Sequence, residues 1–313
     1  MAGPATWGIV STIRAPARAI LDFAAHHLDL GAHRLILHLD EDCPEARAAL
    51  AGHPRCKVIL CDAAYWAGRK RPEAHQARQS FNATRAYRRN PGVDWLAHVD
   101  VDEFLWPARP IADQLAALPA EAPTARVRPI EALAPVDAAP GLWFKGCAVQ
   151  ARQRDAQTAR IYPTYGAYLN GGFLSHAFGK IFVRTGLEGV KLRIHNAFGP
   201  DGAKIANDHD LDHTLLCHLH APTWEDWQRA YRYRLAHGSY RAELKGNGTA
   251  GITMNALFSA IEADGGEVAL RAFYDEVCTA TPELRARLEA EGHLHHADLD
   301  LDAKRARHFP EHA

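Results

Sequence analysis

Hydrophobic residues in the N-terminal part of the chain occur in short runs separated by segments with helical patterns. Four runs have the length of buried strands, and they cover residues 7–13, 33–39, 57–61 and 95–99. The segments between them predict helices, which cover residues 17–28, 43–50 and 73–89. Strands that alternate with helices in this way predict a parallel sheet with crossover helices.

Polar residues lie at or just after the end of each of these four predicted strands. They are Ser11-Thr12, Asp40-Glu41-Asp42, Asp62 and Asp100-Val101-Asp102. In open parallel sheets, ligands bind outside the carboxyl ends of the strands. We therefore expect these side chains to line one edge of the sheet and to include the functional site.

The rest of the chain is less regular and then becomes helical. We expect a mixed or antiparallel section with strands at residues 179–184 and 191–195, and an apolar run at 215–220. Helices are predicted at residues 224–237, 254–264, 267–279 and 282–291. The predicted fold class is α/β, a Rossmann-like and mainly parallel sheet with helices on both faces. We expect one domain over residues 1–240, with a helical extension, 241–313, packed on it.

The acidic segment after the fourth predicted strand carries the clearest candidate chemistry. In an extended chain Asp100 and Asp102 would share one side, and Glu103 would point to the other. Two neighbouring carboxylates raise each other's pKa unless a cation lies between them. A divalent cation with oxygen ligands removes that repulsion and often completes its shell with substrate phosphates. The segment predicts a metal and diphosphate site; the alternative is a strand end with solvated acids.

Composition narrows the class of protein. The 313 residues carry a formal net charge of −1, which argues against bulk binding of nucleic acid. The six cysteines are scattered and form no C-x-x-C pair, which favours a reduced, cytoplasmic interior over a structural zinc site. We expect no signal peptide and no transmembrane segment, because no basic start with an apolar run and no window of membrane length is present. The abundance of Ala and Arg is typical of a bacterial protein.

The acidic segment and several later elements together resemble nucleotide-sugar glycosyltransferases of the GT-A fold, in the family-2-like and family-92-like group. The matching elements are Asp94-Trp95 with Asp100-Val101-Asp102-Glu103-Phe104-Leu105, Gln79-Ser80-Phe81-Asn82-Ala83, residues 179–184, Arg193-Ile194-His195-Asn196 and His218. They span about residues 7 to 240. Relatives often have Lys-Asn-Glu after the first strand, where this chain has Ser11-Thr12-Ile13-Arg14.

The resemblance implies transfer of a sugar from a nucleoside-diphosphate sugar, with a UDP-sugar favoured, to a glycan, polysaccharide or lipid-linked acceptor hydroxyl. A bound Mn²⁺ or Mg²⁺ would stabilise the leaving diphosphate as a Lewis acid. The resemblance implies that Asp102 binds the metal directly and that Asp100 binds it through water or holds the ribose. It also implies that Lys180 lies near the acceptor or the phosphates. A late histidine would be a further ligand. His218 fits the family pattern, but His220 would share its face in a strand, so both remain candidates.

Further candidates for contact with the nucleotide lie at the first two strand ends and on the helix before the acidic segment. They are Ser11, Thr12, Arg14, Asp40, Asp42, Arg78 and Gln79. Helix-capping turns and a solvated helix face are the alternatives for these residues. An inverting transferase also needs a carboxylate base, and the candidates are Glu131, Asp201, Asp208, Asp210 and Asp212. We assign no metal role to the histidines of residues 293–296, which we place at a mobile terminus.

Two other functions are alternatives to sugar transfer. A metal-dependent nucleotidyltransferase also uses paired acids, but it would be expected to have a Gly-rich loop after the first strand, where this chain has none. A non-catalytic nucleotide-sugar binding module could retain the fold. The intact Asp100 and Asp102 and the late histidines argue against it, because loss of such ligands is the simplest route to inactivity.

Overall fold

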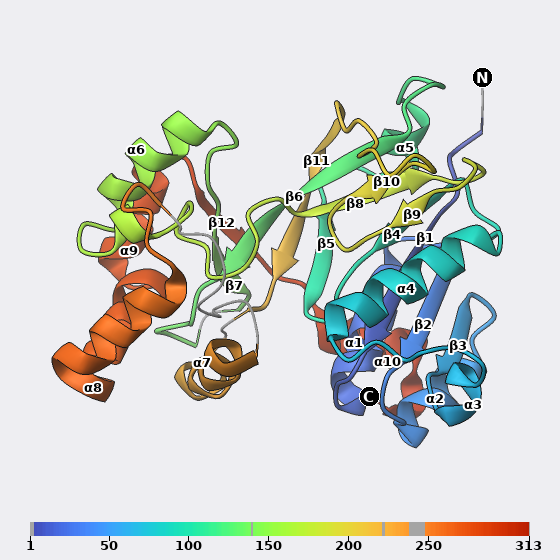
Figure 1. The fold of residues 1–313 in the computed structure, drawn as a ribbon, viewed down its shortest axis with the longest axis horizontal. Helices are drawn as coiled ribbons and strands as arrows, with labels where there is room; N and C mark the ends of the chain where they lie inside the picture. Colours follow the sequence, from blue (N-terminus) through green and yellow to red (C-terminus); the bar gives the residue numbers. More distant parts are fainter. Residues whose placement is uncertain (1–2, 139, 221–222, 238–247, 313) are drawn as a thin grey trace. The chain divides into compact units, whose positions relative to one another are not determined.

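The computed structural model describes residues 3–138, 140–220, 223–237 and 248–312. The chain divides into two compact units (Figure 1). Unit 1 comprises Met1–Arg128, Phe178–Leu216 and Leu299–Ala313, and unit 2 comprises Pro129–Ala177 and Cys217–Asp298. The chain crosses from one unit to the other within the strands β6 (Thr124–Ala132) and β11 (Asp210–His218).

The sheet of unit 1 is built on four parallel strands in the order β3-β2-β1-β4. These strands are β1 (Trp7–Ile13), β2 (Arg34–Leu39), β3 (Cys56–Leu60) and β4 (Trp95–His98). The antiparallel strand β8 (Lys180–Arg184) lies beside β4, and the first residues of β6 lie beside β8. The predicted fold class, a mixed α/β fold with a Rossmann-like parallel core, is confirmed.

Helices cover both faces of this sheet (Figure 1). Helix α4 packs on one face, where Ala83 and Tyr87 join an apolar cluster with Val10, Ile36 and Leu96 of the strands. Helix α1 lies on the other face beside α10. The helices of this unit are α1 (Ala17–Asp29), α2 (Pro44–Ala51), α3 (Ala63–Trp66), α4 (His75–Arg88), α5 (Ile111–Ala116) and α10 (Leu301–His308), followed by the short 3₁₀ helix η2 (Pro310–His312).

The remaining strands of unit 1 are short. Strand β5 (Glu103–Pro107) pairs with β11, and β9 (Lys191–Leu192) pairs with β10 (Ala197–Phe198). The strand predicted at residues 191–195 is therefore too long. It ends at Leu192 because the chain turns back, with the Arg193 N–H donating to the carbonyl of Asn196 at 2.9 Å.

Unit 2 contains a short antiparallel sheet and most of the late helices. Strand β7 (Leu142–Lys145) pairs with the end of β6 on one side and with β12 (Leu294–Ala297) on the other. The placement of residues 293–296 at a mobile terminus was wrong, because this segment forms β12. The helices are α6 (Ala151–Ile161), the 3₁₀ helix η1 (Gly166–Tyr168), α7 (Trp224–His237), α8 (Met254–Cys278) and α9 (Pro282–Ala290).

Helix α8 combines two predicted helices. Gly266 interrupts it with φ +58° and ψ −136°, a conformation that is readily accessible only to glycine, and so the predicted break at Gly265-Gly266 appears as a kink. Thr253 caps its start by accepting a hydrogen bond from the Ala256 N–H at 3.0 Å. Aromatic residues of α7 and α8, among them Trp227 and Phe258, form the core of this unit.

The last two expectations concern the domain boundary and membrane-spanning helices. The predicted domain boundary at residues 240–241 falls within 238–247, outside the described residues, and stays a prediction. Among the helices that the structure describes, we find none that combines the length and the apolar character needed to cross a membrane.

Candidate functional site

Asp100 lies two residues beyond the end of β4, and two side chains hold its carboxylate. Gln79 of α4 donates to Oδ1 at 2.5 Å, and Lys180 donates to Oδ2 at 2.6 Å. Lys180 begins β8, whose antiparallel register against β4 pairs Phe182 with Ala97 and so brings Lys180 to the carboxyl end of β4. The side chain of Lys180 is 1% exposed and that of Asp100 is 26% exposed. The Asp100 carboxylate is therefore fixed in position at the expected edge of the sheet.

The acidic segment is a turn and not an extended strand. The Glu103 N–H donates to the carbonyl of Asp100 at 3.0 Å, and the Asp100 N–H donates to Oε2 of Glu103 at 2.9 Å. Lys180 Nζ lies 3.2 Å from the same Glu103 oxygen. The assignment of Glu103 to the side opposite Asp100 was wrong, because these hydrogen bonds fold residues 100–103 back on themselves. Glu103 is buried and closes the turn.

Ion pairing and burial determine the charge of the groups around Asp100. Burial opposes charge on Asp100 and Lys180, but their mutual attraction lowers the pKa of Asp100 and raises that of Lys180. Burial lowers the pKa of the neighbouring His98 to about 3, so its ring is neutral at pH 7. The Lys180 ammonium thus pairs with the carboxylates of both Asp100 and Glu103, at 2.6 and 3.2 Å. Asp102 is partly exposed.

Thr12 and Arg14, near the end of β1, have partners within the chain. Ser11 and Thr12 are buried, and the Thr12 hydroxyl accepts a hydrogen bond from the Asn82 amide at 3.1 Å. Arg14 forms an exposed ion pair with Glu41 at 2.6 Å. A role of Ser11, Thr12 and Arg14 in nucleotide binding stays a prediction.

The acids that follow β2 pair with arginines. Arg78 Nε donates to Oδ2 of Asp40 at 2.8 Å, and Arg71 donates to Oδ1 at 3.1 Å. Asp42 pairs with Arg47 of α2 at 3.1 Å. The sequence placed Asp40 and Arg78 separately at the nucleotide edge, and the structure joins them in one ion pair at the end of β2.

His218 and His220, at the end of β11, lie in unit 2 beside Glu131 of β6. Ligand atoms of these three side chains lie within 4.8 Å of one another, and the two imidazole centroids are 4.9 Å apart. The sequence offered Glu131 only as a possible base. Asp100 and Asp102 belong to unit 1, and joint binding of one metal by the acids and a late histidine stays a prediction.

Glu131 is held as a buried carboxylate by three donors. The N–H groups of Leu174 and Ser175 lie 3.1 and 2.9 Å from its oxygens, and Lys145 Nζ lies 3.1 Å from Oε1. Burial opposes its ionisation, but the Lys145 ammonium lowers the pKa of Glu131 well below the ordinary value for a glutamate. A carboxylate with so low a proton affinity is a poor general base and a good partner for positive charge.

The donor set of this cluster also fits a cation. One carboxylate with two imidazoles suits Mn²⁺ better than Mg²⁺. Arg234 of α7 donates to Nε2 of His220 at 2.9 Å, so this nitrogen is an acceptor and the ring is neutral. A cation bound at Nε2 of His220 would replace the guanidinium of Arg234.

The other candidate bases differ in their surroundings. Asp210 forms a two-point ion pair with Arg128, with distances of 2.9 and 3.1 Å. Asp201 accepts the N–H of Ala203 at 2.9 Å within a turn. Asp208 and Asp212 are exposed.

Sequence reasoning missed Lys145 and Arg234, and it did not connect Glu131 with the histidines. One signal was present: Lys145 ends the apolar segment Leu142-Trp143-Phe144, and Glu131 lies within another apolar stretch. Charged residues inside such segments are rarely buried without a partner. Nothing comparable in the sequence points to Arg234.

No protein-family model matches the sequence, and a comparison with curated proteins gives no match. Several solved structures show weak similarity. The bifunctional glycosyltransferase WbbM has 11% identity and a TM-score of 0.30 over 57% of this chain, which spans only 31% of the WbbM chain. HddC from Yersinia pseudotuberculosis has 10% identity and a TM-score of 0.35, covering 73% of this chain and 98% of HddC. The galactosyltransferase LgtC, solved with donor and acceptor sugar analogs, has 12% identity and a TM-score of 0.27, covering 56% and 57%. With TM-scores this low, function has to be argued from the side chains.

Proposed function

We propose that the protein is a metal-dependent glycosyltransferase that binds a nucleoside-diphosphate sugar at the turn formed by Asp100–Glu103. The observation that carries the proposal is the position of Asp100, whose carboxylate is held by Gln79 and Lys180 beside the partly exposed Asp102. The turn lies at the carboxyl end of β4, where parallel sheets bind their ligands.

The carboxylates of Asp100 and Asp102 favour a bound divalent cation. An ionised carboxylate repels each unit charge of a diphosphate by about 3 kcal/mol at about 6 Å, with an effective dielectric constant near 20. A divalent cation between the carboxylates and the diphosphate removes this repulsion, and oxygen ligands are the type that Mg²⁺ and Mn²⁺ accept. When bound, the cation stabilises the charge that develops on the leaving nucleoside diphosphate.

The residues of the chain have distinct roles in this proposal. Gln79 and Lys180 fix the two oxygens of Asp100, so the site is organised before the donor binds. Asp102 is the direct ligand of the cation, and Asp100 binds it through water or holds the ribose. Lys180 acts on the donor through Asp100, which makes it a positioning residue.

The finer parts of the proposal concern the substrates. We propose a UDP-sugar as donor, and a glycan, polysaccharide or lipid-linked hydroxyl as acceptor. Mn²⁺ is the preferred cation if His218 or His220 also binds it, because imidazole suits Mn²⁺ better than Mg²⁺.

A thermal-stability screen with UDP, GDP, CMP and dTDP, each with and without Mn²⁺, tests the proposal. We expect the largest stabilisation from UDP with Mn²⁺ and the next from GDP, because a ligand at one hundred times its Kd adds about 2.7 kcal/mol to the folded state. Asp102→Asn should abolish the Mn²⁺-dependent shift.

Asp212→Asn is the matched control, because it removes an exposed carboxylate of unit 1 outside the turn. It should retain the full shift. Absence of any nucleotide-dependent shift in the unmodified protein, or equal loss in both variants, contradicts the proposal.

A further inference from the structure

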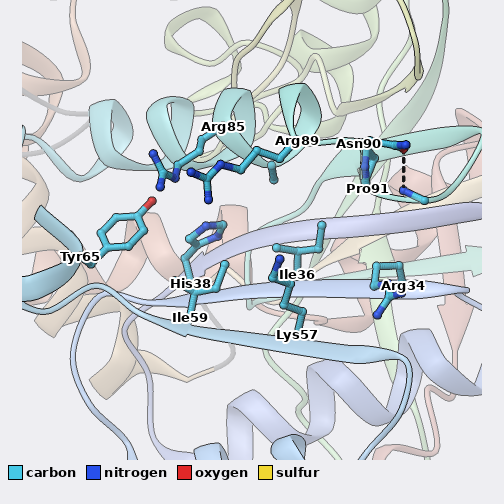
Figure 2. Close-up of a pocket in the computed structure, with 12 residues that line it drawn as sticks. Arg34, Ile36, His38, Lys57, Ile59, Tyr65, Arg85, Arg89, Asn90 and Pro91 are labelled. Atoms are coloured by element: carbon cyan, nitrogen blue, oxygen red, sulfur yellow. Dashed lines mark hydrogen bonds between the residues drawn. The ribbon is translucent and has the colours of Figure 1, made fainter.

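A cavity of about 390 Å³ lies in unit 1, on the face of the sheet that carries α4. Figure 2 shows Arg85 and Arg89 reaching from the helix towards β2, where Ile36 and His38 form part of the opposite wall. Lys57 and Ile59 of β3 continue this wall (Figure 2), and Tyr65 lies at one end. The wall opposite the helix therefore contains the apolar side chains of Ile36 and Ile59, and cationic side chains surround the cavity.

The charged side chains that line this cavity are all positive. Arg34, Lys57, Arg85 and Arg89 line it, and no carboxylate is among the lining residues. Within the part of the chain that the structure describes, none of these four side chains has an acidic group within 4.0 Å. The whole chain has a net charge of −1, so this concentration of positive charge is local.

The proximity of these cations is unfavourable without an anion. Burial and the charge of the neighbouring Arg89 lower the pKa of Arg85. The Arg85 guanidinium is 5.5 Å from the ring centroid of Tyr65, a contact that fixes its direction but supplies no counter-charge. Arginine is the side chain best suited to bind phosphate, because its planar guanidinium forms two parallel hydrogen bonds.

His38 adds an independent polar feature. Its side chain is 1% exposed, and its Nδ1 atom is buried without a hydrogen-bond partner among the described residues. Burial, together with Arg85 and Lys57, lowers the pKa of His38 to about 4, so the ring is neutral at pH 7. A neutral imidazole has one donor and one acceptor nitrogen, and a hydroxyl group can hydrogen-bond to either. The buried Nδ1 atom therefore fits a hydroxyl group of a ligand.

This cavity differs in place from the strand-end site. Arg34 begins β2, and Asp40 follows that strand six residues later, which is about 20 Å along an extended chain at about 3.3 Å per residue. Arg89, Asn90 and Pro91, beyond the last turn of α4, also line the cavity. The cavity thus extends along the sheet towards the amino end of β2, away from the edge that carries Asp100.

The geometry points to a second ligand site, in which Arg34, Lys57, Arg85 and Arg89 bind a phosphate ester whose hydroxyl group hydrogen-bonds to Nδ1 of His38. The cations bind the phosphate, the buried imidazole selects a ligand with a hydroxyl group, and Ile36 and Ile59 contact its carbon atoms. Glycerol phosphate contains both functional groups in one small molecule. It occurs free and as the headgroup of phosphatidylglycerol, and the experiment separates these two sources.

Binding is measured by titration calorimetry with glycerol 3-phosphate, and by co-sedimentation with vesicles that contain phosphatidylglycerol, in both cases with EDTA present. We expect one glycerol 3-phosphate per chain if the ligand is free, or binding to the vesicles alone if it is a lipid headgroup. Arg85→Gln with Arg89→Gln should weaken binding about tenfold or more, which corresponds to about 1.4 kcal/mol. Arg34→Gln with Lys57→Gln, on the strand side, should weaken it similarly and serves as a second variant pair.

The matched control is Arg152→Gln with Arg232→Gln, which removes the same charge from exposed positions of α6 and α7. It should bind as the unmodified protein does. Asp102→Asn should also bind normally, which separates this site from the proposed donor site. Absence of binding to both probes, or an equal loss in the control, overturns the inference.

Discussion

The buried ion pair between Lys145 and Glu131 can be tested by the substitution Lys145→Met, which keeps the length of the side chain and removes its charge. The two side chains are 0% and 2% exposed, and the nitrogen–oxygen distance is 3.1 Å. Lys145 also donates to the carbonyls of Gly172 and Val277 at 2.7 and 2.8 Å. Removing one partner of such a pair leaves a buried charge uncompensated and costs about 3–5 kcal/mol. We expect a loss of that size in the stability of unit 2 at neutral pH.

The size of this loss should depend on pH in a defined direction. In the unmodified protein the pKa of Glu131 is lowered, so its contribution is fully present above the unfolded-state pKa of about 4.3 and is lost only as the pH falls towards the lower, native pKa. In the variant, burial without Lys145 raises the pKa of Glu131. Its carboxyl group then takes up a proton on mild acidification, and the cost disappears. The difference between the two proteins should therefore be largest near neutral pH and shrink towards pH of about 4.

Native-state hydrogen exchange of β7, corrected for the intrinsic exchange rate at each pH, measures this difference. Arg229→Met is the control, because its ion pair with Asp226 is exposed, with 78% and 43% of the two side chains accessible. It should change stability by less than about 0.5 kcal/mol. A loss for Lys145→Met that is the same at every pH would refute the electrostatic explanation and leave packing and the two lost carbonyl bonds as its cause.

Two further substitution and labelling experiments follow from the packing. Gly172 and Gly202 both have positive φ angles, +79° and +81°, but a methyl group on Gly172 would collide with Tyr162, whereas Gly202 faces open space. Gly202→Ala should cost about 1–2 kcal/mol from backbone strain, and Gly172→Ala should lower the thermal midpoint considerably more; equal shifts would contradict the collision. Burial raises the pKa of the Cys278 thiol to about 12 and also raises that of Cys217. Iodoacetamide should therefore modify both only after unfolding, and rapid labelling of the folded protein, read by mass spectrometry, would contradict their burial.

The local patterns in the sequence were sufficient for most of the elements. The parallel core and helix α7 follow directly from apolar runs and helical spacing, and Gly266 marks the kink of α8. Strand β12 could not be found in this way, because its sequence Leu-His-His-Ala has no alternation of apolar and polar residues. It forms because His295 and His296 pair with Phe144 and Trp143 of β7, which lie far away in the sequence.

The candidate site could be located from the sequence, but its geometry could not. The acids after β4 identify the edge of the sheet. The assumption of an extended chain placed Glu103 incorrectly, because the turn depends on hydrogen bonds that spacing does not reveal. Lys180 approaches Asp100 only through the antiparallel pairing of β8 with β4. Likewise Glu131 lies beside His218 because their strands, β6 and β11, pair although they are distant in sequence.

The position of α10 in the chain has a consequence for the order in which the protein folds during synthesis. Arg305 of α10 binds Asp22 of α1, 283 residues earlier, and Arg307 binds Asp29 of the same helix. Every residue of unit 2 lies between these partners in the sequence. A nascent chain has therefore produced all of unit 2 before α10 is available to cover α1. Contacts of such long sequence separation slow folding. The side of α1 that α10 covers consequently stays open until unit 2 has been synthesised.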